Sequence, residues 1–236
     1  MKKPVRILFF ALWLVAFFLP VLLRGATPGT DTPDSPEYVG GKWESGLNGG
    51  KGFLGWNLVT TGPNCGFRIG DSTPSGMAVN TDRGNAFGLY THGKGNTVDA
   101  YRSFDSPLES GQSFQVEMAV NWRNGQKGID LRRVGDNEVI FNFNVGADDY
   151  VVHHAASGNG SLGKEYASKT VFTVRFTQKD ALGGVWKITR SGGVSSVAEG
   201  TYQGLAGGVK FYVMDTDSGA ENELWFNRLT VSAKQK

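Results

Sequence analysis

An alternation of apolar and polar residues at a period of two is the feature that most constrains how this chain folds. It is clearest over 113–121, 138–145 and 171–178, where every second residue is apolar and most of the residues between are polar. Successive side chains of a β-strand point to opposite faces of its sheet, so each segment is predicted to be a half-buried antiparallel strand. The segments 185–190 and 208–214 continue the pattern.

Weaker strand candidates complete the series, at 55–61, 85–92, 97–104, 128–134, 149–154 and 197–203. Beyond the first 26 residues, no segment of helical length has apolar residues at three-and-four spacing. About a dozen short strands with frequent turns predict an all-β protein, and a two-sheet antiparallel jelly-roll sandwich suits the length best. Over 223–231 the apolar residues change phase, which predicts a β-bulge near 227–228.

The first 26 residues differ from the rest in composition. Lys2, Lys3 and Arg6 precede an unbroken apolar run over 7–23. This pattern is typical of a signal peptide, so the sequence predicts an exported protein that is secreted, periplasmic or at the cell surface. The run is longer than the usual apolar core of about 7–15 residues, which leaves retention as an N-terminal membrane anchor open.

The cleavage site of this segment is poorly formed, because a cut after Ala26 places Arg24 at the minus-three position. The segment also accounts for the formal net charge of +2, since it holds four basic residues and no acidic one: Lys2, Lys3, Arg6 and Arg24. No basic stripe remains after it, so nucleic acid is not an expected partner. A membrane is expected as a partner only if this segment is retained.

Three further parts are predicted after the N-terminal segment. Residues 27–40 contain three prolines and no apolar pattern, so we expect an extended, solvated spacer. The sandwich domain is expected over 41–233, followed by a short tail over 234–236. Because Cys65 is the single cysteine, no internal disulfide can stabilise the domain.

Signals for catalysis are weak. The chain has no Gly-x-Ser-x-Gly motif, and the adjacent His153 and His154 would face opposite sides of a strand. The nearest approach to the paired carboxylates of a glycoside hydrolase is Glu221 with Glu223, just before a strand. The sequence therefore favours a protein without catalysis.

A candidate carbohydrate site combines one tryptophan with several polar residues. Sugar rings have apolar C–H faces edged by hydroxyl groups, so their sites pair aromatic side chains with hydrogen-bonding ones. Trp122, Arg123 and Asn124 end a strong strand and meet this description. The polar faces of neighbouring strands are expected to contribute further hydrogen-bonding groups: Asp130, Arg132, Asn142 and Asn144. An ordinary solvated sheet face is the alternative interpretation.

A second candidate site is a group of four carboxylates near the C-terminus: Asp215, Asp217, Glu221 and Glu223. Carboxylate oxygens in a turn are the ligands that calcium selects. The spacing matches no defined calcium loop, so a hairpin turn rich in Asp is the alternative. A calcium ion here would order loops and would have no chemical role.

Several short motifs resemble a largely uncharacterised bacterial module. They occur in matching order and spacing at 43–56, 66–72, 85–90, 101–104, 110–114 and 221–229. This secreted module is similar to concanavalin A-like jelly rolls and is sometimes appended to glycosidases of the α-amylase type. The resemblance implies a non-catalytic accessory role, and it carries no ligand residues over to this chain.

The sequence thus predicts an exported, non-catalytic β-sandwich that binds a polysaccharide or oligosaccharide. A structural or adhesive surface protein without a sugar ligand is the main alternative. A glycoside hydrolase with an unrecognised active site is the less favoured one, and fold class alone separates none of the three.

Overall fold

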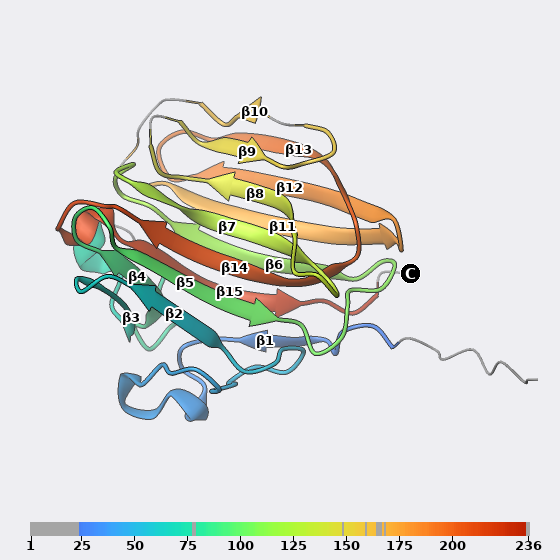
Figure 1. The fold of residues 1–236 in the computed structure, drawn as a ribbon, viewed down its shortest axis with the longest axis horizontal. Helices are drawn as coiled ribbons and strands as arrows, with labels where there is room; N and C mark the ends of the chain where they lie inside the picture. The colour runs from blue at the N-terminus through green and yellow to red at the C-terminus, as the bar shows by residue number, and fades with distance from the viewer. Residues whose placement is uncertain are drawn as a thin grey trace, which may run out of the picture.

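The computed structural model describes residues 24–76, 79–147, 149–158, 160–163, 167 and 169–234. These residues form two antiparallel sheets that lie face to face, with the second sheet in front of the first in Figure 1. The prediction of an all-β, two-sheet jelly-roll sandwich is confirmed.

The strands of the first sheet are β1 (Gly29–Asp31), β3 (Cys65–Gly70), β4 (Ala86–Thr91), β6 (Ser113–Ala119), β11 (Val171–Asp180), β12 (Gly183–Ser191), β13 (Ser196–Gln203) and β15 (Leu224–Val231). They follow the order β13-β12-β11-β6-β15-β4-β3, and β1 pairs with β15.

The strands of the second sheet are β2 (Asn57–Thr61), β5 (Thr97–Ser103), β7 (Gln126–Arg133), β8 (Val139–Asn144), β9 (Val151–His153), β10 (Gly160–Ser161) and β14 (Ala206–Met214). Their order is β10-β9-β8-β7-β14-β5-β2. Short 3-10 helices are formed at η1 (Pro36–Gly41), η2 (Thr73–Ser75) and η3 (Ala220–Asn222).

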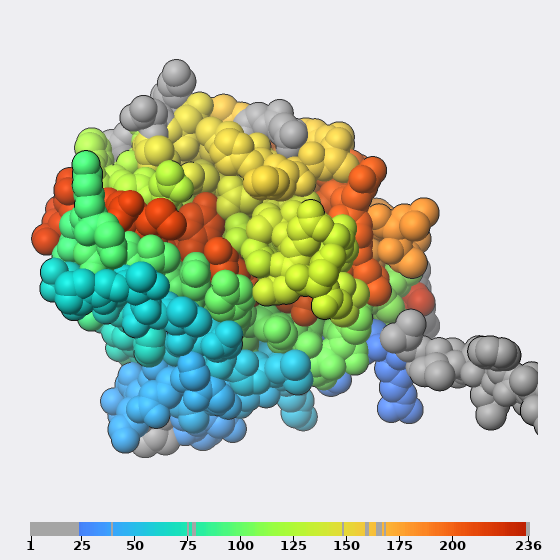
Figure 2. All heavy atoms as spheres, in the orientation of Figure 1, coloured from blue at the N-terminus to red at the C-terminus, as the bar shows by residue number. Residues whose placement is uncertain are grey.

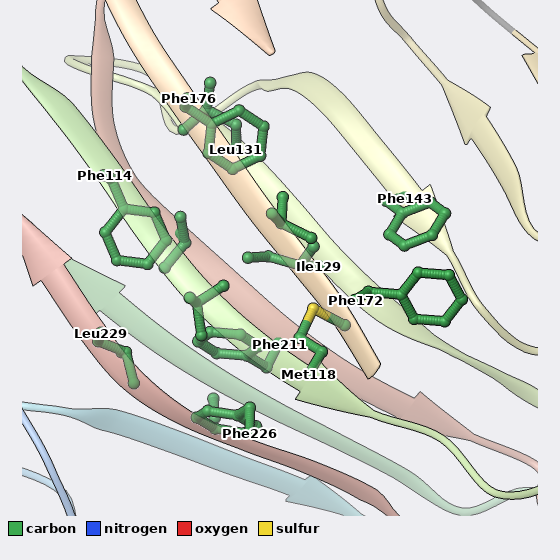
Figure 3. Close-up of a cluster of buried hydrophobic side chains, with 14 of the residues drawn as sticks. Phe114, Met118, Ile129, Leu131, Phe143, Phe172, Phe176, Phe211, Phe226 and Leu229 are labelled. Atoms are coloured by element: carbon green, nitrogen blue, oxygen red, sulfur yellow. The ribbon is translucent and has the colours of Figure 1, made fainter. Parts of the chain in front are cut away.

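The core lies between the two sheets and is built from the inward-facing residue of each alternating pair (Figure 3). Phe114 of β6 is the cross-strand neighbour of Phe176 of β11, and both side chains are buried. Phe211 of β14 stacks on Phe226 of β15 with ring centroids 3.8 Å apart, which joins the two sheets. Each such side chain contributes about 1.5–3 kcal/mol through burial.

The predicted bulge in the last strand is confirmed. Between Asn227 and Thr230 the register of β15 against β6 shifts, and Arg228 has a φ of 56°. The extra residue shifts the alternation by one position, so Leu224 and Phe226 before the bulge and Leu229 and Val231 after it all face the core and are buried. The Asn227 side-chain oxygen accepts a hydrogen bond from the Arg228 N–H at 2.7 Å, which stabilises the turned backbone.

The segment expected to be a solvated spacer, 27–40, is instead part of the sandwich. Its residues Gly29–Asp31 form β1, and the side chains of Asp31 and Tyr38 are buried. The sequence gives little sign of this, because a three-residue strand has no readable period. The buried charge of Asp31 also depends on a partner that is 71 residues away in the chain.

That partner is Arg102 of β5, and the pair is the centre of a buried polar cluster. The Arg102 guanidinium lies 2.5 Å from the Asp31 carboxylate and donates a 2.6 Å hydrogen bond to the Asn48 side-chain oxygen. The Tyr38 hydroxyl donates to Asp31 and accepts from the Trp56 indole N–H at 2.8 Å. We call these five residues the Asp31–Arg102 cluster. It connects β1 of the first sheet to β5 of the second.

Residues 1–23, which make up most of the predicted signal peptide or anchor, lie outside the described residues. Within the part of the chain that is described, no helix is long and apolar enough to cross a membrane.

Asp31→Ala leaves the Arg102 guanidinium buried without its charged partner, so we expect the free energy of unfolding to fall by about 3–5 kcal/mol. Glu117→Gln is the matched control, because it removes an ion pair with the half-exposed Arg228 and is expected to cost about 1 kcal/mol or less. Urea unfolding followed by tryptophan fluorescence measures both changes. Equal losses would contradict a central role for the cluster.

Candidate functional site

A row of polar side chains crosses the outer face of the second sheet. Cross-strand pairing places neighbouring residues of successive strands side by side, and side chains at paired positions share a face. The row comprises Asn57 of β2, Tyr101 of β5, Lys210 of β14, Asp130 of β7, Asn142 of β8 and His153 of β9. We call it the polar row.

The charges in and beside the polar row are paired. The Lys210 ammonium lies 3.2 Å from a carboxylate oxygen of Asp130 and 3.2 Å from one of Asp99. Asp130 also accepts hydrogen bonds from Arg132 at 3.3 Å and from the Asn142 amide at 2.8 Å. Two cations and two carboxylates therefore form one network without net charge.

Aromatic rings complete the network. The Lys210 ammonium lies 5.1 Å from the ring centroid of Tyr212 and 5.9 Å from that of Tyr101, and the Arg132 guanidinium is also 5.9 Å from the Tyr101 ring. Such cation–π contacts hold the rings in fixed positions. Gly128 gives the Tyr212 hydroxyl room, because a Cβ at that glycine would lie 3.0 Å from it.

Two groups of the network, Lys210 and Tyr212, have raised pKa values. Burial acts to lower the pKa of Lys210, but the carboxylates of Asp130 and Asp99 outweigh it and raise that pKa overall. Burial also raises the pKa of Tyr212 well above its usual value. Both groups stay protonated near neutral pH, whereas general acid–base catalysis works best with a pKa near the working pH. The arrangement is suited to binding.

A groove of about 570 Å³ lies at one end of the polar row. Its lining includes three exposed apolar side chains, Leu54, Val59 and Val134, together with Tyr101 and Arg132 from the network. Its volume is in the range of small-ligand sites, about 300–1,000 Å³. Figure 2 looks onto this face, where the yellow-green turn between β7 and β8 projects beside the green surface of β5.

The structure brings together three of the residues expected from sequence, Asp130, Arg132 and Asn142, in one hydrogen-bonded network. Asn144 lies on the same face, two residues further along β8, and its side-chain oxygen accepts a hydrogen bond from the Gly146 N–H. Sequence reasoning missed Tyr101, Lys210, Asp99 and Tyr212. Alternation within their strands marks them as outward-facing, but only the strand order places them beside Asp130.

Trp122, Arg123 and Asn124 lie in the loop before β7, at the opposite end of that strand from Arg132. The Trp122 side chain is 48% exposed. Arg123 lies over the ring of Tyr150, and Asn124 donates a 2.9 Å hydrogen bond to Asp217. These three residues are therefore separated from the groove, and the structure does not join the two halves of the expected carbohydrate site.

The four carboxylates of the expected calcium site have different partners. Asp215 accepts a hydrogen bond from the Gly95 N–H at 2.7 Å, and Glu223 forms an ion pair with Arg68 at 2.5 Å. The Asp217 carboxylate accepts a hydrogen bond from the Asn124 amide. The hydrogen bond of Glu221 is made by its backbone oxygen, which accepts from the Trp122 N–H. Among the described residues no group of three or more His, Cys, Asp or Glu side chains is placed to hold a metal ion, so this geometry lends the calcium site no support.

A buried lysine connects the Trp122 loop to η3. The Lys127 ammonium donates hydrogen bonds to the backbone oxygens of Trp122 at 2.9 Å and Asn222 at 2.6 Å. Burial lowers the pKa of Lys127 to about 7, although the carboxylates of Glu221 and Glu223 oppose the shift. Its position on the inward phase of β7 gives it a structural role.

No protein-family model matches the chain, and no curated protein matches it in sequence. Among solved structures, a sialidase has 10% sequence identity and a TM-score of 0.49, over 75% of this chain and 17% of the sialidase chain. An alginate lyase from Corynebacterium sp. has 14% identity and a TM-score of 0.41, over 64% of this chain and 78% of the lyase.

The galectin LEC-6 from Caenorhabditis elegans has 14% identity and a TM-score of 0.33, over 54% of this chain and 88% of the galectin. Likenesses at this level assign neither a family nor a ligand to the chain. The link to glycosidases of the α-amylase type, which the sequence resemblance implies, has no support among these comparisons.

Between pH 7 and pH 9 the folded chain loses the Lys127 proton, whereas the unfolded chain keeps it because the ordinary pKa of a lysine is 10.5. The contribution of Lys127 to the free energy of unfolding should therefore rise by about 2 kcal/mol over this window. Urea unfolding of the wild type and of Lys127→Met at both pH values measures this rise. The free energy of unfolding of the wild type minus that of the variant should be about 2 kcal/mol larger at pH 9 than at pH 7. The exposed Lys187→Met is the control, and a difference independent of pH would contradict the assignment.

Proposed function

We propose that this protein is an exported, non-catalytic β-sandwich that binds a carbohydrate in the groove at the end of the polar row. One observation carries the proposal: apolar side chains and fixed hydrogen-bonding groups line the same groove. Leu54, Val59 and Tyr101 offer surfaces for the C–H faces of a sugar ring. Arg132 and Asn57 line the groove as well and offer partners for its hydroxyl groups.

The electrostatics favour a neutral sugar over a polyanion. Lys210 and Arg132 are both engaged by Asp130, and Lys210 is also engaged by Asp99. An acidic polysaccharide would have to compete with these carboxylates for the two cations. A neutral glycan requires only hydrogen bonds and contact with the apolar walls, which the groove supplies without breaking the network.

The same pairing weighs against a glycoside hydrolase at this face. Such enzymes need one carboxylic acid that donates a proton and one free carboxylate. Here Asp99 and Asp130 share the Lys210 ammonium, so each carboxylate is already engaged by a cation. A structural or adhesive protein without a sugar ligand is the other alternative, and the binding experiment separates it from the proposal.

The test is binding of the exported protein to an array of plant, bacterial and storage polysaccharides, followed by titration calorimetry with the best oligosaccharide. Tyr101→Ala removes an aromatic surface of the groove, and Arg132→Ala removes a hydrogen-bond donor. We expect each variant to weaken binding about tenfold or more, which corresponds to about 1.4 kcal/mol. Thermal unfolding verifies that both variants remain folded.

Two control variants locate the site. Lys187→Ala changes an exposed residue on the outer face of the first sheet, and Trp122→Ala changes the loop that the sequence favours. Both should bind as the wild type does. If Trp122→Ala abolished binding and Tyr101→Ala did not, the proposal that the sugar binds in the groove would be wrong. No binding across the array would favour the adhesive alternative, and glycan hydrolysis lost in Asp130→Asn would favour the enzyme.

A further inference from the structure

The fold begins directly after the apolar run of the N-terminal segment. Ala26 is 2% exposed and belongs to the hydrophobic core. Its N–H donates to the backbone oxygen of Pro107 at 3.1 Å, and its own oxygen accepts a 2.6 Å hydrogen bond from the Gln112 amide. Gly25 is partly buried and lies against Glu109, since a Cβ there would be 2.4 Å from Cγ of that residue.

These contacts bear on where the N-terminal segment can be removed. A cut after Ala26 would take a core residue away and leave the Gln112 amide, which is only 2% exposed, without its acceptor. An unsatisfied buried polar group costs about 1–3 kcal/mol, and the core loses a packed side chain as well. The folded domain therefore depends on residues that removal at this junction would discard.

The position of Ala26 also identifies the end of the sandwich at which the chain enters the fold. In the sequence only two residues, Arg24 and Gly25, lie between the apolar run and the buried Ala26, so the chain enters the fold at this end. The start of β1 and the end of β11 lie at this end of the sandwich in Figure 1. Residues around Pro107 and around Ala181, in the turn after β11, lie beside Arg24 and Gly25 there.

This end carries an apolar surface. The lining of a hollow of about 190 Å³ includes Arg24, Pro107, Leu108, Glu109, Ala181 and Leu205. Next to it, Leu182 is 81% exposed, more than any other large hydrophobic side chain among the described residues. Arg24 is a cation at the boundary between the apolar run and the fold, where basic residues meet lipid headgroups. The carboxylate of Asp180 accepts hydrogen bonds from the backbone N–H groups of Leu182 and Gly183.

We propose that the chain keeps its apolar N-terminal run, and that the end of the sandwich carrying Leu182 rests on the membrane surface. A lipid bilayer is the partner that this surface fits. It accommodates the apolar run as an anchor, the exposed Leu182 at the level of the acyl chains, and Arg24 among the headgroups. The groove of the second sheet is then held close to the membrane on its outer side.

The first test is the fate of the full chain when it is exported from a bacterial host. We expect the protein in the membrane fraction after carbonate extraction, with an intact mass that includes residues 7–23. Release of the folded domain into solution, whatever its first residue, would overturn the proposal.

The second test measures which end lies near the lipid. In a Cys65→Ser background, Leu182→Cys and Val197→Cys are each labelled with an environment-sensitive fluorophore and reconstituted into vesicles with brominated acyl chains. Val197 is the matched control, because it is also exposed and pairs with Thr189 near the end of β12, whereas Leu182 directly precedes the start of that strand. We expect quenching at least threefold stronger at position 182. Equal quenching at both positions, or stronger quenching at 197, would overturn the orientation.

Discussion

Arg102 lies on the inward face of β5, where alternation would place an apolar residue, and its charge is compensated by Asp31 from the first sheet. Removing two charges from water is costly, and only close pairing with further hydrogen bonds makes it tolerable. Tyr38 and Asn48 supply hydrogen bonds, and the rings of Phe53 and Trp56 each lie with their centroid 4.8 Å from the guanidinium. The closure of the two sheets at this edge depends on this pair.

The same cluster positions one side of the candidate site. Arg102 donates a hydrogen bond to the backbone oxygen of Leu54, whose side chain lines the groove. Tyr101 precedes Arg102 in β5 and faces outward, so the residue that fills the core and a residue that lines the groove are adjacent in the chain. The internal ion pair and the proposed binding surface are thus built on one strand.

Much of the fold follows from the sequence, because period-two alternation is strong in β6, β8 and β11, and the phase change in β15 predicts its bulge. Part of the site follows for the same reason. Asp130, Arg132 and Asn142 occur on polar phases, and their strands are neighbours both in the chain and in the sheet.

The rest of the site depends on strand order and on long-range pairing. Tyr101 and Lys210 are on outward phases as well, but their place beside Asp130 requires β14 to lie between β5 and β7. Asp31 in the expected spacer and Lys127 on an inward phase are charged residues whose burial no local pattern indicates. Trp122 is an exposed aromatic residue, yet its loop lies away from the groove.

Changes in amide NMR shifts during an oligosaccharide titration would report directly on whether a sugar binds in the groove at the end of the polar row. We expect the largest changes to cluster at Leu54, Tyr101, Arg132 and Gly207, which line the groove. Changes centred on the Trp122 loop or on the outer face of the first sheet would contradict it, as would an unchanged spectrum with every glycan tested.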